Sequence, residues 1–307
     1  MSLPSPLDLA TLRTEMRNEL TAGMDGMSAT ELLTVMNSAD AAVPVAVAAA
    51  IGQIAAAVEQ VSAALQRGGR LVYLGAGTSG RIGLLDAVEC PPTFGTDPSQ
   101  VVALLAGGSD AFEAAAEGAE DSPADAVRDV EAAGVGTGDV LVGLTASGRT
   151  PYVIAGLDRA TELGAVTVAV SCNRSALASG HADIAIEVDT GPEVLTGSTR
   201  LKAGTAQKLV CNMLTTAAMV RLGKTFSNLM IDLRPTNEKL FDRARRIVAE
   251  AAGVDLETAG TALEQAGNRC KVATVMLLAG IDLAEAERRL AAASGFVARA
   301  LDVRPTG

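Results

Sequence analysis

The sequence predicts an α/β fold in which a parallel, doubly wound sheet of five strands lies between an N-terminal helical segment and a small C-terminal helical module. Three observations lead to this prediction. Short apolar runs alternate with helical patterns through the middle of the chain, which is typical of parallel strands covered by helices on both faces. Two of these runs end in turns rich in glycine and hydroxyl groups. After residue 237, only helical patterns remain.

The N-terminal segment, residues 1–45, is predicted to consist of helices and turns. Its polar stretch Leu7–Asn37 contains a capping-box pattern at residues 28–31, which predicts a short helix over Glu31–Met36. A long helix rich in Ala, Val and Ile, Asp40–Gln66, is expected to lead into the next domain.

The central domain is predicted to span residues 46–234. Its strands are expected at Leu71–Leu74, Val101–Leu105, Val140–Leu144, Val166–Val170 and Ile184–Val188. Helices are expected at Arg81–Cys90, Asp110–Glu120, Ala124–Ala133, Tyr152–Leu163 and Thr199–Leu222. Because the strands are continuously apolar, we expect both faces of the sheet to be buried.

The C-terminal module, residues 235–307, is predicted to begin near Arg234-Pro235-Thr236. Helices are expected at Glu238–Ala252, Asp255–Gln265, Lys271–Leu278 and Leu283–Ala293, with a short last one, and Gly253, Gly267 and Gly280 are read as helix stops. The apolar pattern Val272, Val275, Met276, Leu277 and Leu278 should pack inside the module or against a partner.

The charge balance limits the classes of partner. The chain has 307 residues and a formal net charge of −11, which argues against nucleic acid and against an anionic membrane surface. A bound anion must therefore be held by local donors. No basic helix-turn-helix of the kind found in transcription regulators is apparent.

The cysteine and histidine content predicts a cytoplasmic protein without a metal or other cofactor. The four cysteines are scattered and form no CxxC motif, so we expect buried thiols in a reducing compartment. The single histidine, His181, has no cluster of metal ligands around it in the sequence. The first 30 residues lack a signal-peptide pattern, and we expect no apolar span of 18 residues.

The first glycine-rich turn, after Leu71–Leu74, predicts a phosphate site. Gly75, Gly77 and Gly80 let the backbone approach an anion, and Thr78 and Ser79 add hydroxyl donors at a helix start. The GxGxxG spacing also occurs in dinucleotide-binding proteins, but the second strand does not end in the acidic residue that would hold a ribose. A tight turn without a ligand is the remaining alternative.

The second turn, Thr145–Pro151, follows the third strand and combines the same features. Turns at the carboxyl ends of parallel strands meet in one crevice, which favours a sugar phosphate over a dinucleotide. Phosphate contacts are expected from Thr78, Ser79, Ser147 and Thr150, and Arg149 is placed either to meet an anion or to face solvent.

Both turns resemble those of the sugar isomerase (SIS) domain, which binds phosphosugars. Longer runs are similar to the N-acetylmuramic acid 6-phosphate etherase family, and the resemblance covers nearly the whole chain. These runs are LGAGTSGRIGLLDAVECPPTFG (74–95), EGAEDS (117–122), GLTASGRTPYV (143–153), EVLTGSTRLKAGTAQK (193–208) and RLGKTFSNLMIDLRPTNEKL (221–240), together with LRTEMRNELTAGMDGMSATELLTVMN near the N-terminus. Glu19 departs from the family pattern, in which a proline is expected.

The resemblance implies cleavage of N-acetylmuramic acid 6-phosphate to N-acetylglucosamine 6-phosphate and D-lactate in peptidoglycan recycling. The implied route eliminates lactate from the ring-opened sugar and then adds water, without a metal or other cofactor. With a single histidine in the chain, the acid and base are expected to be carboxylates.

Family motifs point to particular residues. They imply that Glu89 is the acid and Glu120 the base, although the sequence does not decide between these roles, and Glu113 and Glu117 are rivals. The implied substrate contacts are Gly77, Thr78, Ser79, Ser147, Arg149, Thr150, Glu193, Ser198, Thr199 and Lys202. Lys202 is read either as a contact to the lactyl carboxylate or as a surface lysine, and His181 as structural or as a second-subunit contact.

Other function classes stay open beside the etherase. A non-catalytic phosphosugar-binding regulator, like glucokinase regulatory protein, would carry two such domains, whereas one is found here. A sugar-phosphate isomerase would also remove a proton beside a carbonyl, but the motif Glu89–Pro92 argues against it. With one domain per chain, we expect a homodimer whose subunits share the site.

Overall fold

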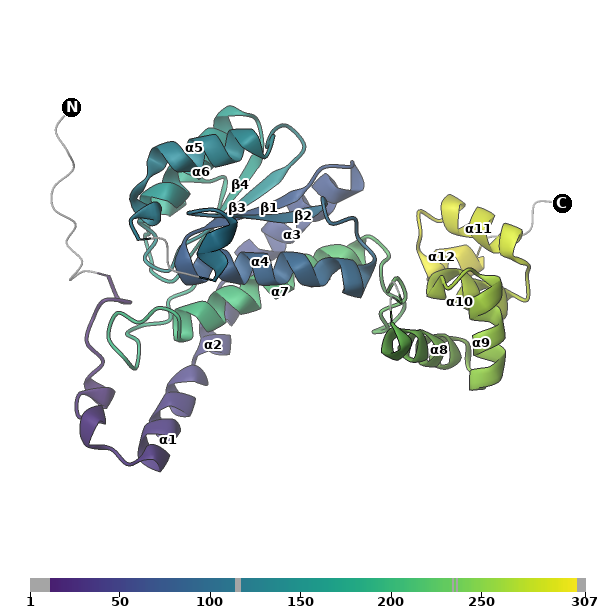
Figure 1. The fold of residues 1–307 in the computed structure, drawn as a ribbon, viewed down its shortest axis with the longest axis horizontal. Coiled ribbons are helices and arrows are strands. Elements are labelled where there is room, and N and C mark those ends of the chain that lie inside the picture. The colour runs from purple at the N-terminus through teal and green to yellow at the C-terminus, as the bar shows by residue number, and fades with distance from the viewer. Residues whose placement is uncertain (1–11, 114–116, 234, 236, 303–307) are drawn as a thin grey trace. The chain divides into compact units, whose positions relative to one another are not determined.

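The computed structural model of this protein describes residues 12–113, 117–233, 235 and 237–302 (Figure 1). The chain divides into two compact units, the first formed by Met1–Ala87 and Ser99–Thr215 and the second by Val88–Pro98 and Thr216–Gly307. Positions 234 and 236, at the predicted domain boundary, lie outside the described residues.

The first unit contains a parallel sheet in the order β2-β1-β3-β4-β5, which confirms the predicted fold class. The strands lie where the sequence predicts them: β1 Leu71–Gly75, β2 Val101–Leu105, β3 Val140–Leu144, β4 Val166–Ser171 and β5 Ile184–Glu187. Strands β1 and β3 are neighbours and are buried at every position. Their carboxyl ends therefore bring the two glycine-rich turns side by side.

Helices cover both faces of this sheet (Figure 1). Helices α5 (Pro123–Ala132) and α6 (Pro151–Glu162) pack on one face, and α3 (Ile51–Gln66) packs on the other together with α4 (Gly77–Phe94) and α7 (Lys202–Arg221). Apolar side chains of β1, β3, β4, α5 and α6 form one core cluster under the first face.

Two buried tyrosines link neighbouring elements, one joining helix α6 to helix α5 and the other joining strand β1 to helix α4. The hydroxyl of Tyr152 on α6 donates to Asp129 of α5 at 2.8 Å. The hydroxyl of Tyr73 on β1 donates to Asp86 of α4 at 2.8 Å. Each tyrosine therefore combines a large buried ring with a satisfied polar end.

The predicted helix Asp110–Glu120 is wrong. The described part of this region contains two short 3₁₀ turns, Ser109–Phe112 and Ala119–Asp121. Gly118 has φ = 72°, a left-handed conformation that cannot continue a right-handed helix. Glu120 consequently lies in a turn just before α5.

Helix α4 is longer than predicted at both ends. It begins at Gly77, inside the glycine-rich turn, and runs through Pro91 and Pro92 to Phe94. The predicted helix end at Cys90 is wrong. Proline loses a backbone donor but has a helical φ, so Pro91 and Pro92 continue the helix, and the turn closes with Gly95 N donating to Pro91 O at 2.9 Å. Glu89 therefore lies within the helix, not in its last turn.

The N-terminal segment contains a separate α1 (Ala29–Asp40) and α2 (Val43–Ala48) before α3. The capping box is confirmed, since Glu31 accepts a hydrogen bond from Ser28 N at 2.8 Å. The predicted continuous helix Asp40–Gln66 is wrong. It is interrupted before α2, which carries Pro44 in its first turn, and again between α2 and α3.

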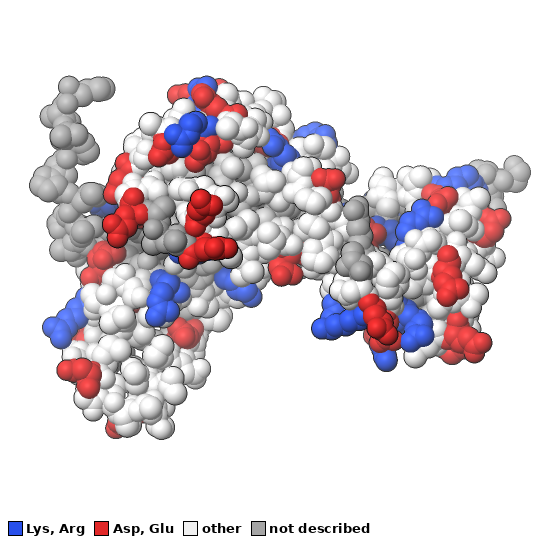
Figure 2. All heavy atoms as spheres, viewed as in Figure 1, with Lys and Arg blue, Asp and Glu red and all other residues white. Residues whose placement is uncertain are grey.

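The run Ala29–Ala48 is long and apolar enough to cross a membrane by length and mean hydropathy, with 11% of its most apolar window buried. The expectation that no such span occurs is wrong by this measure. On the face drawn in Figure 2, this part of the chain carries few charges. However, Glu31 and Asp40 lie within the run, and the helix breaks before Pro44, which are costly features inside a bilayer.

The C-terminal part of the second unit consists of helices, as predicted. They are α8 Glu238–Ala252, α9 Leu256–Gln265, α10 Cys270–Ala279, α11 Leu283–Ala292 and α12 Val297–Asp302. Gly253 and Gly280 end α8 and α10 in the left-handed conformation. Val272 and Val275 lie in the core of this module, whereas Leu278 is 39% exposed, so the predicted apolar pattern is buried only in part.

Candidate functional site

The first turn owes its shape to glycines packed against each other. A Cβ atom at Gly80 would lie 2.5 Å from the carbonyl oxygen of Gly75 and 2.4 Å from a methyl carbon of Leu105, so no other residue fits. Gly77, with φ = +52°, turns the chain directly into α4. The first backbone N–H groups of this helix have no partner within the helix, which suits them to bind an anion.

The second turn owes its shape to side-chain hydrogen bonds. The hydroxyl oxygen of Thr145 lies 2.8 Å from that of Thr150 and accepts a hydrogen bond from Gly148 N at 3.1 Å. Arg149 N donates to the Ser147 hydroxyl at 3.2 Å. Gly148, with φ = +75°, has no room for a Cβ atom, which would lie 2.4 Å from that of Ala176.

The two turns line one pocket of about 460 Å³ at the carboxyl end of the sheet. Eight of the residues predicted from the sequence meet there: Gly77, Thr78, Ser79, Glu120, Ser147, Arg149, Thr150 and Thr199. The pocket is large enough for a monosaccharide phosphate, and its hydroxyl and backbone donors lie together on the side of the turns.

Three of the predicted substrate contacts, Glu193, Ser198 and Lys202, do not line this pocket. Glu193 is fully buried and caps α7, accepting hydrogen bonds from Lys202 N at 3.0 Å and Ala203 N at 2.9 Å. Burial raises the pKa of Glu193 above its ordinary value, against the effect of these two hydrogen bonds. Ser198 belongs to the preceding turns and is likewise absent from the pocket wall.

Lys202 is also buried. Its ammonium donates to Thr190 O at 2.6 Å, and only 6% of the residue is exposed. Burial lowers the pKa of Lys202 below its ordinary value. It is therefore not the surface lysine that the sequence allowed, and the structure does not bring it to the pocket as a lactyl contact.

Glu89 and His181 also lie outside the pocket wall. Glu89 is exposed on α4, more than three helical turns beyond Gly77. His181 Nδ1 lies 2.7 Å from a carboxylate oxygen of Asp158 in α6.

Sequence reasoning missed the N-terminal contribution to the pocket. Leu12 and Glu15 line it, as do Asp121 and the apolar residues Ala76, Ala146 and Pro151. Asp121 was detectable as the neighbour of Glu120. Leu12 and Glu15 reach the pocket by a long-range contact between Thr14 and Asn173, for which the pattern of residues contains no local signal.

Acidic side chains outnumber basic ones on the pocket wall. Glu15, Glu120 and Asp121 are acidic, and Arg149 is basic. A second pocket of about 320 Å³ shares Ala76, Gly77 and Glu120 with the first and adds Arg81 and Glu117. Glu120 therefore borders both pockets, and its carboxylate is available to groups on either side.

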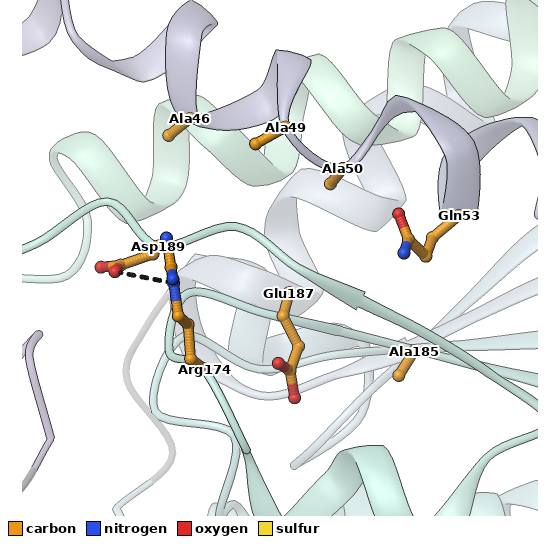
Figure 3. A pocket seen from close by; sticks show the side chains of 8 residues that line it. All are labelled: Ala46, Ala49, Ala50, Gln53, Arg174, Ala185, Glu187 and Asp189. Carbon is orange, nitrogen blue, oxygen red and sulfur yellow. Dashed lines mark ion pairs between the residues drawn. The ribbon is translucent and has the colours of Figure 1, made fainter.

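A third pocket, of about 480 Å³, lies between the start of α3 and the end of β5 (Figure 3). Ala46, Ala49 and Ala50 line one side of it. The Glu187 carboxylate accepts hydrogen bonds from Ser175 N, Ala176 N and the Ser179 hydroxyl, and Arg174 pairs with Asp189 at 3.2 Å. Because its charged groups already have hydrogen-bond or ion-pair partners within the protein, this pocket is a weaker candidate than the first.

Metal binding and thiol chemistry have little support in the described residues. Within the part of the chain that the structure describes, no three His, Cys, Asp or Glu side chains gather to hold a metal ion. The four cysteines are buried, as predicted. Burial raises the pKa of Cys172 and Cys211 well above the ordinary value, so neither thiol readily forms a nucleophilic thiolate.

Family models match the two parts of the chain separately. A model described as the glucokinase regulatory protein N-terminal SIS domain matches residues 53–161, and one described as the SIS domain matches residues 119–217. A model described as the C-terminal lid domain of glucokinase regulatory protein matches residues 227–272.

Curated relatives match nearly the whole chain. A protein from Mycolicibacterium smegmatis named N-acetylmuramic acid 6-phosphate etherase is 60% identical over 295 residues, 96% of this chain and 99% of the relative. Proteins of the same name from Exiguobacterium sp. and Geobacillus thermodenitrificans are 55% and 54% identical over 95% and 96% of this chain, and each match covers 100% of the relative.

Proposed function

The chain belongs to the N-acetylmuramic acid 6-phosphate etherase family, and we propose that it converts N-acetylmuramic acid 6-phosphate and water to N-acetylglucosamine 6-phosphate and D-lactate. The observation that carries this proposal is the pocket in which both hydroxyl-rich turns meet Glu120. The turns supply donors for a phosphate group, and the carboxylate supplies a proton acceptor within reach of the same ligand.

The chemistry is an elimination followed by an addition, which makes the protein a carbon–oxygen lyase. In the ring-opened sugar, a base removes the proton from C2, beside the C1 aldehyde. The electron pair forms a C2–C3 double bond as the C3–oxygen bond breaks, and an acid protonates the departing lactyl oxygen. Water then adds its hydroxyl to C3 and a proton to C2, which gives N-acetylglucosamine 6-phosphate.

We assign the base role to Glu120, which also activates the water in the second half of the reaction. It lines the pocket and lies in a short turn between Gly118 and α5. Ser147, Thr150 and the N-terminal turn of α4 hold the phosphate, and Arg149 adds a positive charge beside it. These groups fix the substrate while the proton moves.

We assign the acid role to Glu89, supplied by a second copy of the chain. This carboxylate is exposed on α4 and is absent from the pocket wall of its own chain. A homodimer in which each subunit offers its Glu89 to the other pocket accounts for both observations, and oligomer interfaces commonly follow such twofold symmetry.

The alternatives receive less support. The family models carry the name of a regulatory protein, but the full-length relatives at 50–60% identity are named etherases. No described feature favours a sugar-phosphate isomerase over the etherase. Four buried cysteines suit a reducing compartment, so we place the protein in the cytoplasm, away from nucleic acid and membranes.

D-lactate release from N-acetylmuramic acid 6-phosphate tests the activity. We expect release by the wild type and a loss of about 100-fold or more in Glu120→Gln, because general base catalysis contributes on the order of 10²–10⁴ in rate. Glu113→Gln, which changes an exposed rival outside the pocket, should keep full activity. No release by the wild type would refute the etherase, and equal release by Glu120→Gln would refute its role.

Mixing two inactive variants tests the shared site. If each site combines Glu89 of one subunit with Glu120 of the other, a mixed dimer of Glu89→Gln and Glu120→Gln contains one intact site. Random exchange of subunits should then restore about a quarter of the wild-type activity. No restoration, with subunit exchange shown independently, would contradict a site built from two chains.

A further inference from the structure

The N-terminal segment is tied to the second turn by a buried asparagine. The side chain of Asn173, 2% exposed, donates to the Thr14 hydroxyl at 2.9 Å and to Ala146 O at 3.1 Å, and it accepts from Thr14 N at 3.3 Å. Thr14 itself is fully buried. This clamp joins residues that are 159 positions apart in the sequence.

Further contacts on both sides of Thr14 hold the same segment in place. Arg13 pairs with Asp189 at 3.1 Å, and the Thr21 hydroxyl donates to Val194 O at 2.8 Å. Glu15 N closes a turn by donating to Leu12 O at 2.9 Å. Residues 12–21 are therefore attached to the sheet domain at several points.

The attached segment places one carboxylate in the phosphosugar pocket. Glu15 lines the pocket together with residues of both turns, and its Oε2 lies 3.5 Å from the position that a Cβ atom at Gly197 would take. Glu15 is half-buried. The acid and base roles proposed above do not require it.

We propose that Glu15 determines specificity for the sugar by accepting hydrogen bonds from its hydroxyl or amide donors. This inference rests on the proposed function, because it takes a phosphosugar as the ligand. A phosphate dianion is repelled by a carboxylate, so it binds at the hydroxyl and backbone donors of the turns. Glu15 then faces the uncharged, donor-rich part of the same ligand.

Thr14 and Asn173 act on the ligand through Glu15. The hydrogen bonds of Asn173 to Thr14 fix the backbone on which Glu15 stands. Thr14→Val keeps the shape of the side chain and removes the hydroxyl that Asn173 contacts, while the bonds from Asn173 to the second turn remain. This makes Thr14 a positioning residue that can be tested separately from the turn.

Isothermal titration with two ligands, N-acetylglucosamine 6-phosphate and inorganic phosphate, tests the proposal. We expect Glu15→Ala to weaken binding of the phosphosugar about 10- to 100-fold, the effect of losing a hydrogen bond to a charged group. Binding of inorganic phosphate should not weaken, because the variant removes a repelling carboxylate and leaves the turns intact. Glu15→Gln should restore part of the sugar affinity because it keeps an acceptor oxygen.

Two comparisons complete the experiment. Glu19 is an exposed carboxylate on the same segment, outside the pocket, so Glu19→Ala should leave the affinities for the phosphosugar and for inorganic phosphate unchanged. Thr14→Val alone should weaken phosphosugar binding. Added to Glu15→Ala, it should weaken binding little further, because both changes act on the same contact.

The outcomes separate this inference from the proposed function. Wild-type protein that neither binds the phosphosugar nor releases D-lactate would overturn both. With an active wild type, an unchanged phosphosugar affinity in Glu15→Ala would overturn the inference alone. An equal loss of phosphate affinity would also overturn it, since Glu15 would then be supporting the turns.

Discussion

The two turns that line the pocket are shaped by different physical means. The turn after β1 is shaped by backbone packing, with Gly80 against Gly75, and passes directly into α4. The turn after β3 is shaped by side chains, through the Thr145–Thr150 contact and the hydrogen bonds of Asn173 to Ala146 and Ser147. The first is therefore a local structure, whereas the second depends on residues that are distant in the sequence.

This difference predicts different sensitivities to mutation. In the first turn, adding a single carbon atom at Gly80 should be severe, because backbone and buried side chains already fill the space. In the second turn, a carbon atom added at Gly148 would also clash, but removing one hydroxyl should be costly as well, because hydrogen bonds hold the loop in its shape.

Gly80→Ala should have the largest effect. The added carbon would lie 2.4–2.5 Å from Leu105 and Gly75, so we expect a loss of about 3 kcal/mol in the free energy of unfolding and loss of phosphosugar binding. Gly77→Ala is the matched control, with φ = +52° and no atom within 4 Å, and should cost about 1 kcal/mol. Chemical denaturation measures both, and equal losses would contradict the steric account of this turn.

Thr145→Val should have an intermediate effect, concentrated on the second turn. The variant keeps the shape of the side chain but removes the hydroxyl that lies 2.8 Å from Thr150 and accepts from Gly148 N. We expect a cost of about 2 kcal/mol, because Gly148 N loses its acceptor in a buried place. Denaturation and phosphate titration measure stability and binding, and an unchanged phosphate affinity would show that the turn does not need this network.

The smallest expected effect is a pH dependence of stability that comes from Asp86, in the helix that follows the first turn. Asp86 of α4 is 6% exposed and accepts hydrogen bonds from Tyr73, Asn212 and Thr215. Burial raises the pKa of its carboxyl in the folded protein, against the lowering effect of these bonds. The folded state therefore holds this proton more tightly than the unfolded state does.

The sign of the pH effect follows from that difference. The stability contributed by protonated Asp86 is present below the unfolded pKa and is lost as pH rises through the folded pKa. The stability of wild type minus that of Asp86→Asn should therefore fall with rising pH, starting near the ordinary value of 3.8. Denaturation over a range of pH measures it, and a difference that rises with pH would contradict the burial effect.

The sheet was predictable because its signals are local. Each buried strand is a short apolar run next to a turn, and every strand predicted from this pattern is present. Two of the predicted helices have other extents in the structure, because the backbone conformation at particular residues decides where a helix stops. Gly118 in a left-handed conformation stops the predicted Asp110–Glu120 helix, whereas Pro91 and Pro92 are accommodated within α4.

The site was predictable in part, because the turns that line it follow directly after predicted strands. The sequence places Thr78, Ser79, Ser147 and Thr150 at the ends of neighbouring strands, and the structure brings them to one pocket. Whether a side chain such as Lys202 or Glu193 points into the pocket or caps a helix depends on three-dimensional packing. Glu15 could not be placed from the pattern because its position depends on the contact between Thr14 and Asn173.

The most direct test of the account is the reaction of N-acetylmuramic acid 6-phosphate in heavy water, followed by NMR. Elimination and addition predict D-lactate together with N-acetylglucosamine 6-phosphate that carries deuterium at C2. Glu120→Gln should form neither product at an appreciable rate. Release of D-lactate with the original proton retained at C2 would contradict the elimination, and an unchanged rate in Glu120→Gln would contradict the pocket as the place where it happens.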